Sequence, residues 1–248
     1  MPSEEAAGFD AIFRVLDTPA YRDAIRDFSG SDDLADDVVP FSFTTVSELD
    51  RIAEALALQP GEAFVDMACG LGGAGLWVAR ASGASLTGVD LSEEAARRAR
   101  RRASAWELQD RATFVVADMI DTGLPAGAFA GVMSIDAIPF VDAGAVLREI
   151  ARLLRPGGML VATAFESDAA KRPTVVADYR PYFDAVGLRV LTHEELPHWR
   201  KRQEEFYAAI LRRAERLRAE MGEIAETLLS EAAHTSPNRR VFMVAKRQ

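Results

Sequence analysis

The chain has 248 residues, of which 49% are hydrophobic, so it can bury one substantial core but hardly two independent ones. Its formal net charge of -9 repels phosphate backbones and anionic membranes, which argues against a nucleic acid or a membrane as partner. The single cysteine, Cys69, excludes an intramolecular disulfide, and neither a signal peptide nor a long apolar run is visible, so we expect a cytoplasmic protein.

The first 58 residues are predicted to form an N-terminal helical cap. Apolar residues recur at helical spacing over Phe9 to Leu16 and over Val46 to Leu58, and an acidic loop at Asp32 to Asp37 separates these helices. Just before the second helix, Pro40 to Thr44 is expected to form an extended aromatic corner.

From residue 59 to residue 248, short β-rich runs alternate with helical ones. Such alternation is typical of a parallel sheet covered by helices, and it predicts an α/β, Rossmann-like, doubly wound sheet of seven strands. A ligand is then expected at the carboxyl ends of the strands, near the reversal in strand order. The predicted strands are Ala63–Ala68, Ser85–Leu91, Thr113–Ala117, Gly131–Ile135, Met159–Phe165, Leu188–Leu191 and Val241–Ala245, with helices such as Glu93–Trp106 and Ala143–Leu154 between them.

A helical insertion is expected at about residues 197–236, before the last strand. One long charged helix is predicted from Trp199 to about Leu229, with a single apolar stripe. The stripe consists of Phe206, Ile210, Ala214, Leu217, Met221, Ile224 and Leu228. We expect it to pack on the same chain; a lid over the substrate and a dimer seam are the alternatives, so the chain is expected to be a monomer or a homodimer.

The strongest motif runs from Phe64 to Gly75, where a strand passes through a turn of small residues into a helix. Gly70, Gly72 and Gly75 satisfy the spacing G-x-G-x-x-G, which nicotinamide and flavin enzymes also use. Asp66 ends the strand, where a carboxylate attracts a ligand with an ammonium and a sulfonium and repels a pyrophosphate. The motif therefore favours S-adenosylmethionine over a dinucleotide, with a solvated turn aspartate as the alternative.

Two further acids end the next two strands. Asp90 lies about twenty residues after the glycine loop, where a carboxylate can accept hydrogen bonds from both ribose hydroxyls. Ser92 then begins the next helix, so we expect Asp90 to serve the ligand and not the helix cap. Asp118 ends the third strand and can accept from an adenine amino group, while Met119 packs against the ring.

In the order of these motifs the chain resembles the class I S-adenosylmethionine-dependent methyltransferases, and among them the small-molecule enzymes of bacterial natural-product pathways. The resemblance runs from about Phe41 to the C-terminus and includes Val132 to Ala137 and Arg152 to Gly158. It implies S-adenosylmethionine as cofactor. It also implies transfer of a methyl group to oxygen or nitrogen of a small-molecule substrate held between the sheet, the N-terminal helices and the insertion.

The resemblance further implies roles for individual residues, and relatives also close the segment around Phe41 to Thr44 over the cofactor. Carried over by position, these residues are Asp66, Gly70 and Gly72 at the methionine moiety, Asp90 at the ribose, Asp118 and Met119 at the adenine, and Asp136 and Ala137 at the methyl group, with Phe43, Thr44, Ala68 and Leu91 completing the set.

The sequence departs from the family pattern in two places. Ala68 stands where the family usually has a glycine, which is tolerable if its φ is negative. Related enzymes often carry one or two histidines just after the fourth strand, whereas this chain has Pro139 and Phe140. The base that the family would use is therefore missing from its usual place.

A base must then come from elsewhere, unless none is needed. Glu166, which ends the fifth strand, and His193, near the sixth, are the predicted catalytic residues, and Asp136 is a third candidate. The other histidines, His198 and His234, are expected to be structural. A neutral amine or a carboxylate could accept the methyl group by in-line displacement without any base.

Three other functions remain as alternatives to methyl transfer. The first is a non-methylating reaction, such as cyclisation or a pericyclic step, in an enzyme that still binds the cofactor; the absent histidines favour it. The second is a nicotinamide-dependent oxidoreductase, against which Asp66 argues. The third is a cofactor-sensing module without catalysis.

Two remaining features are interpreted as structural or absent. The basic run from Arg97 to Arg102 is expected to be a solvated helix face. No metal site is expected, because acids and histidines do not recur together at ligand spacing.

Overall fold

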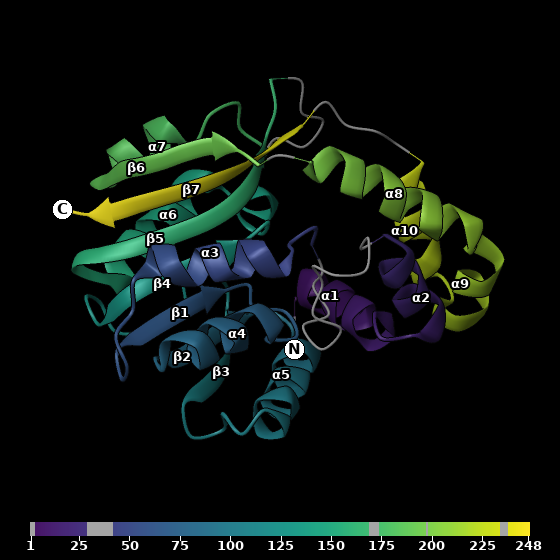
Figure 1. The fold of residues 1–248 in the computed structure, drawn as a ribbon, viewed down its shortest axis with the longest axis horizontal. Helices are drawn as coiled ribbons and strands as arrows, with labels where there is room; N and C mark the ends of the chain where they lie inside the picture. The colour runs from purple at the N-terminus through teal and green to yellow at the C-terminus, as the bar shows by residue number, and fades with distance from the viewer. Residues whose placement is uncertain (1–2, 29–41, 169–173, 197, 234–237) are drawn as a thin grey trace.

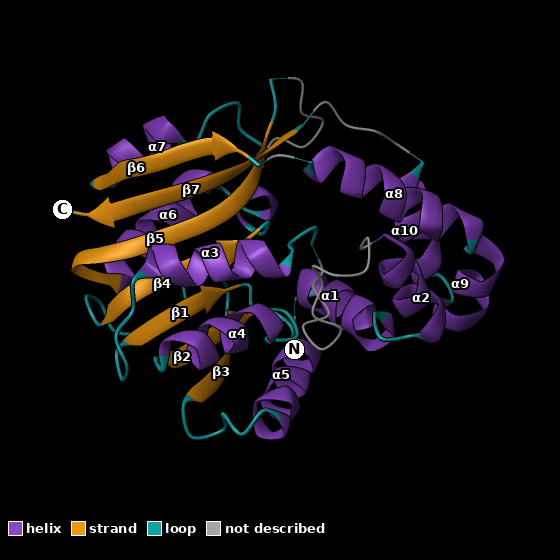
Figure 2. Ribbon diagram, in the orientation of Figure 1, coloured by secondary structure: helices purple, strands orange, loops and turns teal. Residues whose placement is uncertain are grey.

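The computed structural model describes residues 3–28, 42–168, 174–196, 198–233 and 238–248. Its centre is a seven-stranded sheet in the order β3-β2-β1-β4-β5-β7-β6, in which β7 is antiparallel to both of its neighbours and the other pairs are parallel (Figure 2). The predicted seven-stranded, Rossmann-like fold is thus confirmed. The strands are β1 (Ala63–Met67), β2 (Ser85–Asp90), β3 (Ala112–Val116), β4 (Phe129–Ile135), β5 (Leu154–Glu166), β6 (Leu188–Glu195) and β7 (Arg239–Arg247).

Helices cover both faces of this sheet, as Figure 1 shows. On one face lie α3 (Val46–Leu56), α4 (Gly73–Ser82) and α5 (Glu93–Ala105), and on the other α6 (Ala143–Leu153) and α7 (Arg180–Ala185). Side-chain caps fix where two of them begin: Ser92 Oγ accepts from the Ala95 amide at 3.0 Å in α5, and Asp142 Oδ1 from the Ala145 amide at 2.7 Å in α6. A short 3₁₀ turn, η1 (Ile138–Phe140), follows β4.

A third group of helices lies beside the carboxyl edge of the sheet, at the right of Figure 1. It contains α1 (Glu4–Val15), α2 (Pro19–Phe28), α8 (Trp199–Arg212), α9 (Ala214–Met221) and α10 (Ile224–Ala232), packed around one apolar cluster. The first 58 residues are therefore divided between this group and α3, which lies on the sheet. Within the described ranges, no helix has both the length and the apolar character of a membrane span.

The predicted continuous helix from Trp199 to Leu229 is wrong, because α8, α9 and α10 are separate helices. Gly222 ends α9 with φ 60° and ψ -138°, a conformation that is essentially restricted to glycine. The break allows α10 to fold back against α8 and α9. The apolar stripe nevertheless packs on the same chain as expected, with Ile210 and Leu217 both fully buried.

Helix α2 was not predicted from the sequence. Pro19 follows Thr18 and looks like a break, yet proline is well suited to the first helical position, where its absent N–H is not needed. Ala20, Tyr21 and Ala24 on this helix are buried. The predicted acidic loop at 32–37 lies outside the described residues.

Candidate active site

A pocket of about 1190 Å³, its open mouth included, lies at the carboxyl ends of β1 to β4, where the strand order reverses. Helix α1 forms its outer wall. The structure brings ten of the twelve predicted cofactor residues to the lining. These ten are Thr44, Asp66, Ala68, Gly70, Asp90, Leu91, Asp118, Met119, Asp136 and Ala137.

Gly72 does not line the pocket, although it belongs to the glycine loop. It precedes α4 with φ 76°, and a Cβ at this position would come within 2.8 Å of Ala99 Cβ and 3.0 Å of the Phe114 ring. Gly72 therefore allows α5 and β3 to approach the loop. Gly70, with φ 51°, lines the pocket as predicted, and the ring of Phe13 from α1 lies next to it.

Ala68 departs from the expectation of a negative φ, because its φ is 56°. This left-handed conformation is the one for which the family glycine is suited. The condition under which alanine is tolerated is therefore not met, and the chain holds a strained alanine at the end of β1.

Asp66 lies at the base of the glycine loop and is only 2% exposed. Burial, together with the nearby carboxylate of Asp90, raises the pKa of Asp66 to about 8. Its Oδ2 atom is buried without a hydrogen-bond partner. This carboxyl therefore holds a proton to higher pH than an ordinary aspartate, and a cation next to it would favour its ionised form.

Asp90 holds the backbone of the glycine loop in addition to facing the pocket. Its Oδ2 accepts from the Gly70 amide at 2.7 Å and its Oδ1 from the Ser92 amide at 2.9 Å. Burial raises the pKa of Asp90 above its ordinary value. As expected, Asp90 faces the pocket and Ser92 caps the helix; each oxygen of Asp90 has one backbone donor and keeps one further acceptor position.

At the end of β3, Asp118 and Met119 form another part of the lining. Asp118 Oδ1 accepts from the Ile120 amide at 3.0 Å, which folds the chain into a turn, and Met119 is 8% exposed. A second acceptor oxygen and an apolar thioether therefore lie side by side at this corner of the pocket.

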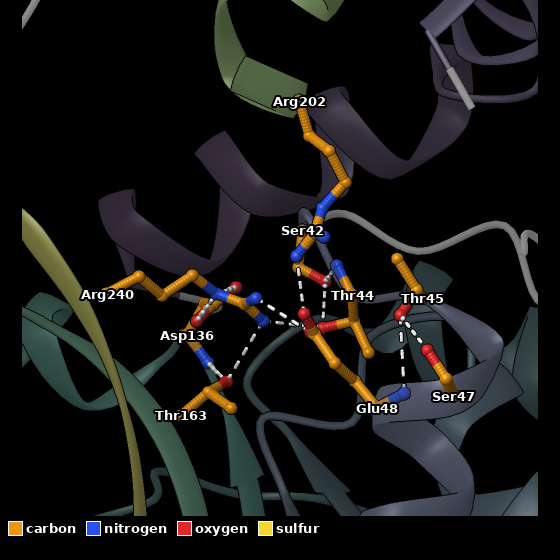
Figure 3. A network of polar contacts seen from close by, with 9 residues as sticks. All are labelled: Ser42, Thr44, Thr45, Ser47, Glu48, Asp136, Thr163, Arg202 and Arg240. Carbon is orange, nitrogen blue, oxygen red and sulfur yellow. Dashed lines mark hydrogen bonds and ion pairs between the residues drawn. The ribbon is translucent and has the colours of Figure 1, made fainter. Parts of the chain in front are cut away.

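Asp136 is bound by a buried arginine, as Figure 3 shows. Both of its oxygens accept from Arg240 Nε, at 2.9 and 3.0 Å, and its own φ is 56°. The carboxylate is thus already neutralised by a guanidinium that is 0% exposed. This excludes Asp136 as the third candidate for the base.

The two predicted catalytic residues contact each other: His193 Nε2 lies 2.8 Å from Glu166 Oε1. Neither residue lines the pocket. Glu166 is 0% exposed and also accepts from the Tyr179 amide at 2.8 Å and from Arg239 Nε at 2.9 Å. These bonds occupy both carboxylate oxygens, so the structure places Glu166 and His193 in an ion-pair network beside the site.

Asp178 joins these two residues in a group whose three ligand atoms lie within 4.8 Å of one another, although the sequence indicated no such cluster. Each carboxylate in it already pairs with an arginine, Glu166 with Arg239 and Asp178 with Arg180. The negative charge that a metal ion would require is therefore already compensated.

Phe43 does not face the pocket either. Its ring packs against Trp199, Phe206 and Tyr207, with centroid distances of 6.5, 6.0 and 6.0 Å. It connects the start of α3 to α8, whereas its neighbour Thr44 reaches the lining. Phe41 and His234 lie outside the described residues, and His198 precedes α8 with a φ of 63°.

Sequence reasoning missed the contribution of α1. Glu5, Phe9 and Phe13 line the pocket at intervals of four residues, so one face of α1 covers the opening. Phe9 also meets Phe140, with ring centroids 6.1 Å apart. The spacing of four was visible in the sequence, but nothing there indicated which element this face would meet.

Helix α1 is fixed in place by polar contacts with α5. Asp10 Oδ1 accepts from Ser92 Oγ at 2.5 Å and from the Glu94 amide at 3.1 Å. Arg98 donates to the Phe13 carbonyl and, at 2.8 Å, to Asp17. The basic run on α5 is therefore not simply a solvated face, because part of it anchors the wall of the pocket.

Comparison with known proteins gives a consistent result. Residues 64–158 match the family model described as a methyltransferase domain. The chain is 28% identical over 229 residues to the 27-O-demethylrifamycin SV methyltransferase of Amycolatopsis mediterranei, covering 83% of this chain and 82% of that protein.

Two solved structures resemble the whole or most of the fold. The [4+2]-cyclase SpnF superposes with a TM-score of 0.79 at 18% identity, over 100% of this chain and 96% of that one. The geranyl diphosphate C-methyltransferase of Streptomyces coelicolor A3(2) was solved with S-adenosyl-L-homocysteine. It superposes with a TM-score of 0.63 at 20% identity, over 82% of this chain and 76% of that one. At such identities the likeness shows the fold alone.

Proposed function

We propose that this chain, which resembles the class I S-adenosylmethionine-dependent methyltransferases, methylates an oxygen or nitrogen atom of a small, uncharged and largely apolar molecule of the natural-product type. One observation carries this proposal: the described lining combines acidic and apolar side chains and contains no lysine, arginine or histidine. Such a lining favours a cationic cofactor and disfavours an anionic substrate. The similarity to an enzyme named for 27-O-demethylrifamycin SV supports the natural-product class.

The residues at the base of the pocket fit the cofactor. The buried, unpartnered Oδ2 of Asp66 matches a ligand ammonium, which would bring both a donor and a compensating charge. We propose that Asp66 and Gly70 hold the methionine moiety, that Asp90 holds the ribose and that Asp118 and Met119 hold the adenine. When bound, S-adenosylmethionine supplies a methyl group on a positively charged sulfur.

The substrate, in this proposal, lies between the cofactor and α1. Phe9, Phe13, Phe140 and Val141 line this part of the pocket. They offer apolar contact area and exclude water, while the alignment of nucleophile, methyl group and sulfur supplies most of the rate acceleration in such a displacement.

Glu5 is the carboxylate that we propose as the proton acceptor for a hydroxyl substrate. The other acids of the lining are committed: Asp66 is buried at the base of the glycine loop and is assigned to the cofactor, Asp90 and Asp118 accept from backbone amides, and Asp136 is paired with Arg240. Glu5 lies on the same face of α1 as Phe9 and Phe13. Glu5 would accept the proton that the substrate hydroxyl loses on methylation, while the bond between the methyl group and sulfur breaks and S-adenosylhomocysteine leaves.

The role of Glu5 is tested with Glu5→Gln and a matched control, Glu4→Gln. Both residues are exposed acids in the first turn of α1, but Glu4 does not line the pocket. A general base contributes about 10²–10⁴-fold, so we expect kcat to fall about 100-fold or more in Glu5→Gln only. Equal activity of the two variants would remove Glu5 from the mechanism and favour a nucleophile that needs no base.

The proposed reaction is tested by incubating the protein with methyl-deuterated S-adenosylmethionine and neutral polyketide alcohols and amines, including 27-O-demethylrifamycin SV. Geranyl diphosphate serves as the anionic control. We expect a trideuteromethylated product and one S-adenosylhomocysteine per turnover for a neutral substrate. Methylation of geranyl diphosphate alone would refute the substrate class.

A second function is supported by one observation, the likeness over the full chain to a [4+2]-cyclase. In that case the protein binds the cofactor and isomerises a polyene without consuming it. The same assay separates the two functions, because conversion of a substrate to an isomer of equal mass without S-adenosylhomocysteine identifies the cyclase.

A further inference from the structure

Arg240 lies at the centre of a buried polar network between the sheet and the helical group (Figure 3). Its guanidinium, on β7, is 0% exposed. Besides Asp136, it donates to Glu48 Oε2 at 2.7 Å and to Thr44 Oγ1 at 2.8 Å. A guanidinium has five donors in a rigid fork, so one side chain can fix three segments that are distant in sequence.

Two of the residues that Arg240 holds belong to the pocket. Asp136, after β4, and Thr44, just before α3, both line it. Asp136 has a left-handed backbone, an arrangement that persists only where its surroundings enforce it. The bifurcated hydrogen bond from Arg240 Nε to both oxygens of Asp136 helps to supply that constraint.

The network continues to α8 through the second oxygen of a glutamate. Glu48 Oε1 accepts from Arg202, whose side chain is 20% exposed. Two arginines therefore face two carboxylates, so that the four charges balance in a site largely shielded from water. Loss of Arg240 would leave Asp136 without its partner, and loss of Arg202 would leave Glu48 and Asp136 to share the single charge of Arg240.

We propose that Arg240 is a positioning residue that sets Thr44 and Asp136 as walls of the cofactor pocket, and that the Glu48–Arg202 contact makes cofactor binding and docking of α8 favour each other. This inference rests on the cofactor of the proposed function but not on methyl transfer. By linkage, if docked α8 strengthens cofactor binding, the bound cofactor must stabilise docked α8 to the same degree.

The test measures binding of S-adenosylhomocysteine by calorimetry to the wild type, Arg202→Gln and a control, Arg213→Gln. Arg213 belongs to the same helical segment and is buried to a similar degree, but it pairs with Asp27 on α2 at 2.6 Å, outside the network. We expect Kd to rise about 5- to 20-fold in Arg202→Gln and to stay within twofold in Arg213→Gln. Equal Kd values in all three proteins would overturn the link to α8.

Hydrogen exchange provides a second measurement, because a change in overall stability alone would not alter the protection of α8 by the cofactor. In the wild type, S-adenosylhomocysteine should slow amide exchange in residues 199–212, and this protection should be lost in Arg202→Gln but kept in Arg213→Gln. Adding Glu48→Gln to Arg202→Gln should raise Kd by less than the product of the single effects, because both changes break one contact. Unaltered exchange of α8 on binding would contradict the proposal.

Arg240→Lys tests the positioning role itself, since it keeps the charge but cannot span three partners. We expect its Kd for S-adenosylhomocysteine to rise about tenfold or more. A folded Arg240→Lys with lowered Tm but unchanged Kd would show that Arg240 only stabilises the fold. Failure of the wild type to bind S-adenosylhomocysteine would instead refute the proposed function, which keeps the two failures distinguishable.

Discussion

At the residue scale, the four strand-end aspartates of the pocket are in different states although they look alike in the sequence. Asp66 is buried and protonated, Asp90 and Asp118 accept from backbone amides, and Asp136 is paired with an arginine. Their positions could be predicted, because parallel strands end at one edge. Their states could not, because Arg240 lies more than a hundred residues after Asp136 in the chain.

Asp66 should make stability depend on pH. Its folded-state pKa of about 8 lies above the ordinary value near 4, so the folded protein binds an extra proton between these limits. The contribution to the free energy of unfolding is complete below pH 4 and is lost as the pH rises to 8. Between pH 6 and 8, the free energy of unfolding of the wild type should thus fall by up to about 2 kcal/mol. Asp66→Asn should not show this fall, and thermal unfolding of both proteins measures the difference.

Binding of the cofactor should reverse this protonation. An ammonium beside Asp66 favours the carboxylate, so S-adenosylhomocysteine should displace close to one proton at pH 7. Calorimetry in buffers of different ionisation enthalpy measures that number. Two results together would show that Asp66 is ionised in the free protein. These are a free energy of unfolding that changes with pH equally in the wild type and Asp66→Asn, and a cofactor that displaces no proton on binding.

Ala68 should respond to replacement by glycine. An alanine with positive φ costs about 1–2 kcal/mol, whereas glycine loses about 0.5–1 kcal/mol in extra backbone entropy on folding. Ala68→Gly should therefore stabilise the fold by about 0.5 kcal/mol. Ala57→Gly is the matched control, because Ala57 has a φ of 50° at the exposed end of α3 and does not line the pocket. A stability loss confined to Ala68→Gly would mean that its methyl group supports the pocket.

At the scale of elements, periodicity predicted where most helices lie but not where they break. The stripe from Phe206 to Leu228 is real, yet α8, α9 and α10 divide it. Apolar spacing continues across a short break, because the same face must be buried on both sides. The first break falls at Arg213, and the second depends on Gly222, a single residue that a pattern of apolar positions does not reveal.

Substitutions at two glycines test whether the backbone of Gly222 causes the break between α9 and α10. A Cβ would meet nothing within 4 Å at either Gly8 or Gly222, so only the backbone differs. Gly8 is inside α1, where alanine is favoured by about 0.5–1 kcal/mol, whereas Gly222 has φ 60° and ψ -138°. Gly8→Ala should raise the free energy of unfolding, and Gly222→Ala should lower it by about 1–3 kcal/mol, both measured by denaturant titration. A neutral Gly222→Ala would mean that α9 and α10 can join without cost.

At the scale of the whole molecule, the sheet and its ligand-binding edge could be derived from the chain alone, since they follow from local alternation and strand-end residues. The outer wall of the pocket could not. Glu5 and Phe9 are brought over the sheet by contacts between α1 and α5, and the predicted base, Glu166 with His193, is instead paired with Arg239. Such pairings depend on tertiary distances that the sequence does not contain.

The same packing leads to a prediction for the state of assembly. Ile210, Leu217 and Met221, which could have formed a dimer seam, are at most 5% exposed because α1, α2 and α10 cover them within one chain. A stripe already buried in this way cannot contribute apolar area to a second copy. We therefore expect a monomer of 27.0 kDa by light scattering at micromolar concentration, with and without S-adenosylhomocysteine. A species of twice that mass would require an interface elsewhere, and a mass that changed on cofactor binding would place that interface near α8.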